Sequence, residues 1–284
     1  MTAGSSEGFT LARGLDPRYL PNKILMLLLP VLFILSVGWS LYLGESIIQS
    51  LIFSVVQVLI VFLCWAIARE LDPDHDYAAF FGIPLLFHPL VFGQGNILIL
   101  FWFLIALRIL NQTTGKQVST TDILFFIFLT LLVVILSAAV LLIILAIAVL
   151  ILSSLLSTNH STDILLSLPL FPSFLLILLI TPDAWTLLRP TLSNLVFISI
   201  SSILLFLVTA TTHEIRCTGD YSSHRLSVKR IQATQIMGLL SIVIISVFHG
   251  GILFVYPIWA AIIGIGLYRI IKNGGKKVFS IQNR

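Results

Sequence analysis

Long apolar runs alternate with short polar stretches along almost the whole chain. A helix needs about 20 apolar residues to cross the roughly 30 Å hydrocarbon core of a bilayer, and several runs reach that length. A transmembrane β-barrel would instead show polar and apolar positions in alternation. The pattern therefore predicts an all-α fold, an integral membrane helical bundle of about ten transmembrane or partly re-entrant segments. The apolar segments cover residues 24–43, 46–68, 77–92, 97–110, 122–138, 139–156, 164–181, 191–211, 231–248 and 251–271.

Two regions of this pattern are ambiguous. The segments 77–92 and 97–110 are short for a span and are separated by the polar sequence GQGN. Residues 122–156 are almost continuously apolar and too long for one untilted span, so they form either two short helices or one long helix. Periodicity does not separate these alternatives, because a helix buried in lipid is apolar on all sides.

Composition leaves no room for a large soluble domain. The 284 residues are 58% hydrophobic and only 10% charged, whereas soluble domains average about 25% charged residues. We predict an N-terminal cytosolic segment over residues 1–22, a helical transmembrane domain over 23–272 and a basic cytosolic tail over 273–284. The lipid bilayer is then the main partner, self-association or a membrane partner stays open, and no nucleic acid is expected.

The basic residues indicate an orientation. With ten segments and a cytosolic N-terminus, only Arg189 of the sixteen lysines and arginines falls on the outer side. Cytosolic loops of membrane proteins carry an excess of Lys and Arg, so both termini are predicted to be cytosolic. The net charge of +4 belongs to this topology signal and is not evidence for nucleic-acid binding. If residues 77–110 formed a single span, Arg108 and Lys116 would move outside, which favours two segments there.

The most polar stretch is ARELDPDHDYAAFFG, residues 68–82, and it has two interpretations. In the first, Asp72 precedes a proline and caps the start of the third helix, with acidic residues in its first turn. In the second, Asp72, Asp74 and Asp76 supply oxygen ligands to a divalent ion such as Mg²⁺. The spacing starts like an EF-hand loop but lacks the required glycine and the final glutamate, and no second acidic motif accompanies it. The helix-start interpretation is the simpler of the two.

Other polar residues are candidates for a site or for packing. His88 lies next to a proline in a short apolar segment, where it either contributes to a re-entrant pocket or is an interfacial histidine. With Arg69 and Arg108, it is a candidate for binding a substrate. In the segment 46–68, small and polar residues follow one helical face and either pack against a neighbouring helix or line a polar path. These residues are Ser46, Ser50, Ser54 and Gln57.

Three stretches together resemble an uncharacterised group of bacterial polytopic membrane proteins. They are RELDPD from Arg69 to Asp74, LRILNQTTG from Leu107 to Gly115, and LSVKRIQA from Leu226 to Ala233. The resemblance implies a multi-pass protein of the bacterial inner membrane and transfers no catalytic residue.

Three function classes follow from the sequence. The first is a non-enzymatic multi-pass membrane protein, which we favour. The second is a transporter of a neutral or apolar solute, since few ionisable residues lie within the membrane segments. The third is a metal-dependent enzyme on a lipid-linked substrate, with the acidic stretch 70–76 holding the metal and Arg69 or Arg108 binding phosphate.

Overall fold

The computed structural model describes most of the chain. The described residues are 10–87, 95–137, 139–157, 170, 172, 191–220, 225–248 and 251–282, with side chains described up to Lys272 in the last helix. Throughout these residues the regular structure is helical, and the only β pairing is an isolated bridge between Thr218 and Arg225. The all-α prediction is confirmed.

The described part of the bundle is built from α-helices, with two 3-10 helices after the second one. The α-helices are α1 (Leu20–Tyr42), α2 (Ile47–Leu71), α3 (Ile97–Asn111), α4 (Thr120–Ser137), α5 (Leu141–Leu155), α8 (Leu192–Ala210), α9 (Val228–Phe248), α10 (Gly251–Phe254) and α11 (Tyr256–Gln282). The 3-10 helices are η1 (Asp76–Phe80) and η2 (Ile83–Phe87).

Among the described residues, five helices are long and apolar enough to cross a membrane: α1, α2, α4, α8 and α9. Helices α3 and α5 have 15 residues each, which is short for a span of about 20. Many large apolar side chains on α1, α2 and α8 are exposed at the surface of the bundle, as expected for helices that face lipid. The chain is a multi-pass membrane protein.

The ambiguous regions are now partly resolved. Residues 122–156 form two helices, because α4 ends at Ser137 and α5 begins at Leu141. The segment 77–92 does not form an α-helix in its described part, which consists of η1 and η2. Of the segment 164–181, only residues 170 and 172 are described. The predicted count of ten segments is therefore not confirmed.

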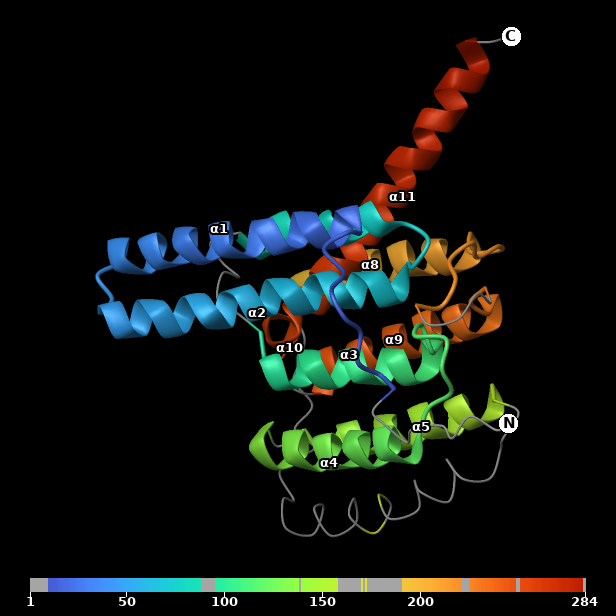
Figure 1. The fold of residues 1–284 in the computed structure, drawn as a ribbon, viewed down its shortest axis with the longest axis horizontal. Coiled ribbons are helices and arrows are strands. Elements are labelled where there is room, and N and C mark those ends of the chain that lie inside the picture. Colours follow the sequence, from blue (N-terminus) through green and yellow to red (C-terminus); the bar gives the residue numbers. More distant parts are fainter. Residues whose placement is uncertain are drawn as a thin grey trace.

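One end of the bundle gathers the basic residues, and we call it the basic end. Helices α1, α4 and α9 begin there, and α2, α3, α5 and α8 end there (Figure 1). The far half of α11 leaves the bundle on this side (Figure 1). Most lysines and arginines with described side chains belong to the helix ends and connections that meet here: Arg13, Arg18, Lys23, Arg69, Arg108, Lys116, Arg216, Arg225, Lys229 and Arg230. Arg269 of α11 binds Asp72 at the end of α2, and Lys272 follows it within one turn.

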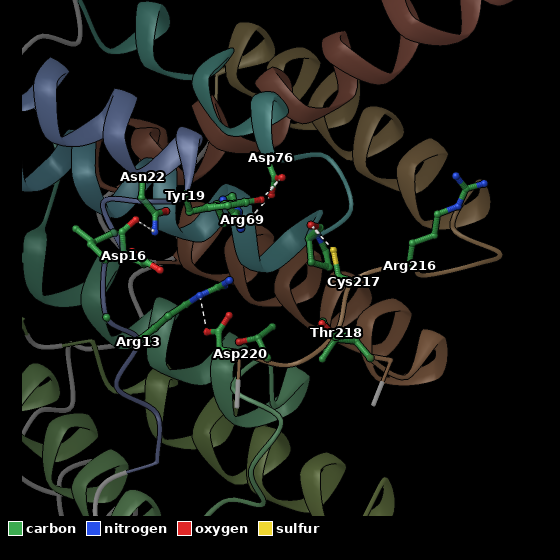
Figure 2. A pocket seen from close by; sticks show the side chains of 15 residues that line it. Arg13, Asp16, Tyr19, Asn22, Arg69, Asp76, Arg216, Cys217, Thr218 and Asp220 are labelled. Carbon is green, nitrogen blue, oxygen red and sulfur yellow. Dashed lines mark hydrogen bonds and ion pairs between the residues drawn. The ribbon is translucent and has the colours of Figure 1, made fainter. Parts of the chain in front are cut away.

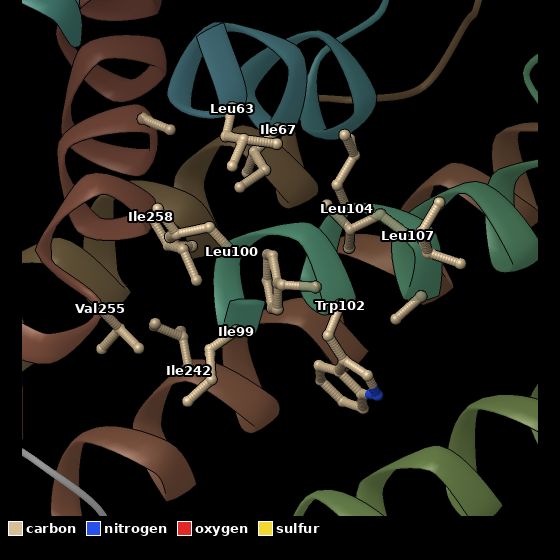
Figure 3. Close-up of a cluster of buried hydrophobic side chains, with 14 of the residues drawn as sticks. Leu63, Ile67, Ile99, Leu100, Trp102, Leu104, Leu107, Ile242, Val255 and Ile258 are labelled. Carbon is tan, nitrogen blue, oxygen red and sulfur yellow. The ribbon is translucent and has the colours of Figure 1, made fainter. Parts of the chain in front are cut away.

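Helix α3 is the centre of the core. Most of its side chains are buried, and it packs against α2, α4, α5 and α9. Figure 3 shows side chains of α2, α9 and the start of α11 gathered around it. Trp102 is fully buried, stacks on Phe126 and donates a hydrogen bond from Nε1 to Thr130 Oγ1 at 2.9 Å. The indole N–H is thus satisfied within an apolar core.

The small and polar face of α2 is used for packing. Ser50, Ser54 and Gln57 are buried, and α1 lies along α2 with Ser36 and Ser40 buried on its own face. Small residues allow helices to approach closely in a membrane, so the packing interpretation accounts for this face. Ser46 has a different role, since it caps α2 by accepting a hydrogen bond from Gln49 N.

Helix α11 passes very close to the connection between η1 and η2. A Cβ atom built on Gly264 would lie 2.3 Å from the backbone nitrogen of Gly82, and one on Gly82 would lie 2.6 Å from Ala260 O. Neither position can carry a side chain without a shift of backbone. Two glycines thus set the distance between α11 and the chain that follows the acidic stretch.

Candidate functional site

The acidic stretch does not start a third helix as the simpler interpretation predicted. Asp72 is the C-cap of α2, where its backbone N–H donates to Ala68 O. The next element, η1, begins only at Asp76, and its N-cap residue His75 makes no side-chain capping bond. The Asp72 carboxylate instead accepts two hydrogen bonds from Arg269 of α11, at 3.0 and 2.8 Å, and one from His75 Nδ1 at 2.9 Å. The N-cap prediction was wrong because a partner distant in sequence binds this carboxylate.

Asp74 and Asp76 face other partners. Asp74 accepts hydrogen bonds from the backbone N–H groups of Arg216 and Cys217 at 2.9 to 3.0 Å, which fixes the α8–α9 loop. Asp76 forms an ion pair with Arg69 Nη2 at 3.0 Å and accepts a hydrogen bond from the Tyr19 hydroxyl. Within the described residues, no three His, Cys, Asp or Glu side chains are placed to hold a metal ion. The Mg²⁺ site stays a prediction that this geometry does not support.

Glu70 is the centre of a buried network between α2 and α3. Its carboxylate accepts hydrogen bonds from Arg108 Nε at 3.1 Å and Thr113 Oγ1 at 2.9 Å. Asn111 Nδ2 donates to Glu70 O at 2.7 Å, and Arg108 Nη1 donates to Leu11 O at 3.1 Å. Arg108, a substrate-binding candidate, is thus occupied mainly by a carboxylate and a carbonyl of its own chain.

Arg69 is held differently. Its side chain is only 7% exposed, and its guanidinium lies 5.4 Å from the ring centre of Tyr19 and 5.5 Å from that of Trp65. Nη2 binds Asp76, but Nε and Nη1 have no hydrogen-bond partner among the described residues. These two nitrogens carry three of the five N–H bonds of a guanidinium. Buried polar groups are normally satisfied, so this side chain has donors left for a ligand.

A cavity of about 700 Å³ lies against Arg69 at the basic end. Its walls come from the N-terminal segment before α1, the end of α2, the residues after α3 and the α8–α9 loop (Figure 2). Arg69, Tyr19 and Asp76 form one side, and an ion pair between Arg13 and Asp220, 2.7 Å long, forms another. Arg216 also contributes to the wall, but its guanidinium points away from Arg69 (Figure 2).

Titratable groups of the pocket are kept neutral or paired. Burial and the hydrogen bond to Asp76 raise the pKa of Tyr19 to about 12, so the phenol stays a donor at neutral pH. Burial and the nearby Asp74 raise the pKa of Cys217 to about 12, and its thiol donates to Pro73 O. A thiol of this kind is a poor nucleophile, because the thiolate is the reactive form. Burial also raises the pKa of Asp220, although Arg13 acts in the opposite direction.

The structure distributes the predicted site residues over separate places. Arg69 and Asp76 line the pocket, Arg108 lies in the Glu70 network, and His88 lies outside the described residues. Sequence reasoning missed Arg13, Tyr19 and Asp220. Their polarity was visible, but the close approach of the N-terminal segment to the α8–α9 loop had no sequence signal.

The ion pair of Asp72 predicts a dependence of stability on pH. Burial alone would raise the pKa of Asp72, but the hydrogen bonds from His75 and Arg269 outweigh it and lower the pKa below the ordinary range. The stabilisation by the ionised carboxylate is therefore present above about pH 4 and is lost as the pH falls through the lowered pKa. We expect Asp72→Asn to lower the thermal unfolding temperature near neutral pH and to differ little from wild type at the acidic end. The measurement is the thermal unfolding temperature of wild type and Asp72→Asn in detergent from neutral to acidic pH. A difference between the two temperatures that does not shrink with acidification contradicts the ion pair.

Comparison with protein-family models, with curated proteins and with solved structures finds no match for this chain.

Proposed function

We propose that this multi-pass membrane protein binds an anionic group in the pocket at its basic end, and that it acts by binding and not by catalysis. The observation that carries the proposal is the buried guanidinium of Arg69, with two nitrogens unpartnered among the described residues, beside a cavity of about 700 Å³. A ligand with acceptor oxygens would satisfy these donors.

The energetics of a buried charge support an anion as the ligand. Removing a guanidinium from water is costly, and attraction to partners repays that cost only when its N–H groups are bonded. Asp76 accepts a bond from Nη2, whereas Nε and Nη1 have no acceptor among the described residues, since the nearby rings of Tyr19 and Trp65 present π faces to the guanidinium. Arginine binds phosphate and carboxylate through strong charge-assisted hydrogen bonds. Cation–π contacts with Tyr19 and Trp65 and the ion pair with Asp76 hold the guanidinium in place before the ligand arrives.

The chemistry of the neighbouring side chains favours binding over reaction. Cys217 and Tyr19 keep their protons at neutral pH, and the carboxylates of Asp72, Asp74 and Glu70 each hold a partner within the fold. The transporter and the metal-dependent enzyme remain predictions from sequence without a supporting contact in the described residues.

The orientation that we propose places the pocket on the cytosolic side of a bacterial inner membrane. Lys and Arg accumulate at the ends of membrane helices that face the cytosol, and the basic end collects them here. The N-terminal segment and the far half of α11 lie at this same end. Both termini would then be cytosolic.

Replacement of Arg69 tests the proposal. We expect wild type, purified in detergent, to bind inorganic phosphate in isothermal titration, and Arg69→Gln to bind it about 10- to 100-fold more weakly, because charged hydrogen bonds contribute about 1.5–3 kcal/mol. Arg69→Lys keeps the charge and is expected to recover part of the affinity.

Lys229→Gln is the matched control, since Lys229 is an exposed basic residue at the start of α9 that lines neither cavity, and it is expected to bind like wild type. Size-exclusion chromatography and thermal unfolding establish that each variant is folded. Equal phosphate affinity for wild type and folded Arg69→Gln would refute the proposed site.

A further inference from the structure

A second, narrow cavity of about 30 Å³ adjoins the pocket. Both cavities are lined by Arg69 and Asn22 and by residues of the N-terminal segment. The narrow cavity is further lined by Phe62, Trp65 and Ala66, which precede Arg69 along α2, and by Glu70 and Arg108, which form an ion pair with each other. Since α2 ends at the basic end, Phe62, Trp65 and Ala66 lie deeper in the membrane than Arg69. The site therefore continues from the pocket into a narrow crevice that has an apolar wall only where Phe62, Trp65 and Ala66 of α2 line it.

Trp65, which lines this crevice, carries another unpartnered donor. Its side chain is 5% exposed, and Nε1 has no hydrogen-bond partner in the part of the chain that the structure describes. Trp65 precedes Arg69 by four residues, so the two side chains lie on one face of α2 and are separated by one turn, roughly 6 Å along the axis. Trp65 Nε1, Arg69 Nε and Arg69 Nη1 are all donors, so the complementary ligand offers acceptors at two depths.

The charged residues of the pocket wall further restrict the charge that the ligand can carry. The wall of the pocket contains three arginines and three aspartates: Arg13, Arg69, Arg216, Asp16, Asp76 and Asp220. A ligand with several negative charges, such as a diphosphate, would meet Asp76 and Asp220 at close range, which costs free energy. Among the three arginines of the wall, Arg69 is the buried one, and a single negative charge matches its guanidinium.

We infer that the ligand is a phosphodiester lipid, with its phosphate on Arg69 and the carbonyl oxygen of an acyl ester on Trp65 Nε1. This inference rests on the anion-binding function proposed above and names the class of ligand. In a phospholipid, the ester oxygens lie deeper than the phosphate, which is the order of the two donors along α2. Arg69 is in the last turn of a helix long enough to span the membrane, and Trp and Tyr side chains are typical of this interfacial depth.

A lipid that lacks the ester carbonyl tests the inference without altering the protein. Phosphatidylglycerol with ester-linked chains and its ether-linked analogue have the same headgroup charge, but only the first has a carbonyl acceptor. We expect detergent-solubilised wild type to bind the ester lipid about 2- to 10-fold more tightly than the ether lipid in native mass spectrometry titrations, the range of one neutral hydrogen bond.

Two variants test whether Trp65 and Arg69 are responsible for the preference for the ester lipid. Trp65→Phe removes the N–H and keeps a ring beside Arg69, so we expect it to bind both lipids with equal affinity and to retain inorganic phosphate binding. Arg69→Gln is expected to bind both lipids and phosphate weakly. Lys229→Gln, at an exposed residue that lines neither cavity, is expected to behave as wild type in all three titrations.

The outcomes separate this inference from the proposed function. Equal affinity of wild type for the ester and ether lipids, together with phosphate binding that requires Arg69, would refute the inferred binding of a lipid ester by Trp65. The anion site itself would still be supported. A preference for the ester lipid that survives in folded Trp65→Phe would also refute the assignment. Loss of any dependence on Arg69 for phosphate and for both lipids would refute the anion site itself.

Discussion

Replacing Glu70 by alanine is expected to lower the free energy of unfolding by about 3–5 kcal/mol, the usual cost of removing one member of a buried ion pair. Glu70 is 1% exposed, and its carboxylate accepts hydrogen bonds from Arg108 and Thr113. Without it, the bond to Leu11 O is what the described residues leave to the Arg108 guanidinium. An uncompensated charge would then remain between α2 and α3, next to the most buried helix of the bundle.

A double-mutant cycle measures the interaction itself. Glu70→Ala, Arg108→Ala and the double variant would be compared by equilibrium unfolding in mixed micelles of detergent and SDS. The double variant is expected to be less destabilised than the sum of the single changes, because it leaves no unpaired charge. Glu45→Ala alters an exposed glutamate in the turn between α1 and α2 and is expected to change stability by about 0.5 kcal/mol or less. Additive effects at Glu70 and Arg108 would contradict the ion pair.

Much of the helical architecture could be predicted from apolar runs alone. The segment 46–68 corresponds to α2 (Ile47–Leu71), and 97–110 corresponds to α3 (Ile97–Asn111). In a bilayer, backbone groups must be bonded within the segment, so an apolar run of sufficient length has one stable solution. Helix type and helix bounds therefore follow from local sequence.

The chain between α2 and α3 could not be predicted this way. Residues 77–92 are apolar enough for a helix, yet the described part contains two 3-10 helices that pack against α2 and α11. Gly82 and Pro84 interrupt the segment, and a proline removes a backbone donor. The decisive contact is the close approach of α11 to Gly82, which involves residues more than half the chain apart.

In the candidate site too, the local sequence predicted some features, and contacts between distant residues determined the others. Sequence reasoning selected Arg69 and Arg108 as phosphate-binding candidates, and both lie at the basic end. It could not distinguish their roles, because Glu70 binds Arg108 whereas Arg69 contacts the rings of Tyr19 and Trp65. Two of the stretches that carry the family resemblance meet in the Glu70 network, and Arg230 of the third donates a hydrogen bond to Leu110 O at 3.0 Å.

Replacing Gly264 by alanine is the second change with a large expected effect, a loss of about 3 kcal/mol or more in the free energy of unfolding. The new Cβ would lie 2.3 Å from Gly82 N, 2.7 Å from Gly82 Cα and 2.8 Å from Phe81 C. All three atoms belong to the backbone, so no side-chain rotation relieves the overlap. Either α11 or the η1–η2 connection must move.

The matched control is Gly38→Ala in α1, where a Cβ would meet no atom within 4 Å. There the usual helix preference applies, and we expect a gain of about 0.5–1 kcal/mol. Opposite signs for the same substitution in two helices, measured by unfolding in mixed micelles, would establish the contact; similar small gains at both sites would refute it.

The Gly264 variant also connects the packing of α11 to the pocket, because η1 begins with Asp76, the carboxylate that binds Arg69 Nη2. A displaced η1 moves that carboxylate, so Gly264→Ala is expected to weaken phosphate binding although Gly264 does not line the cavity, whereas Gly38→Ala is expected to leave binding unchanged.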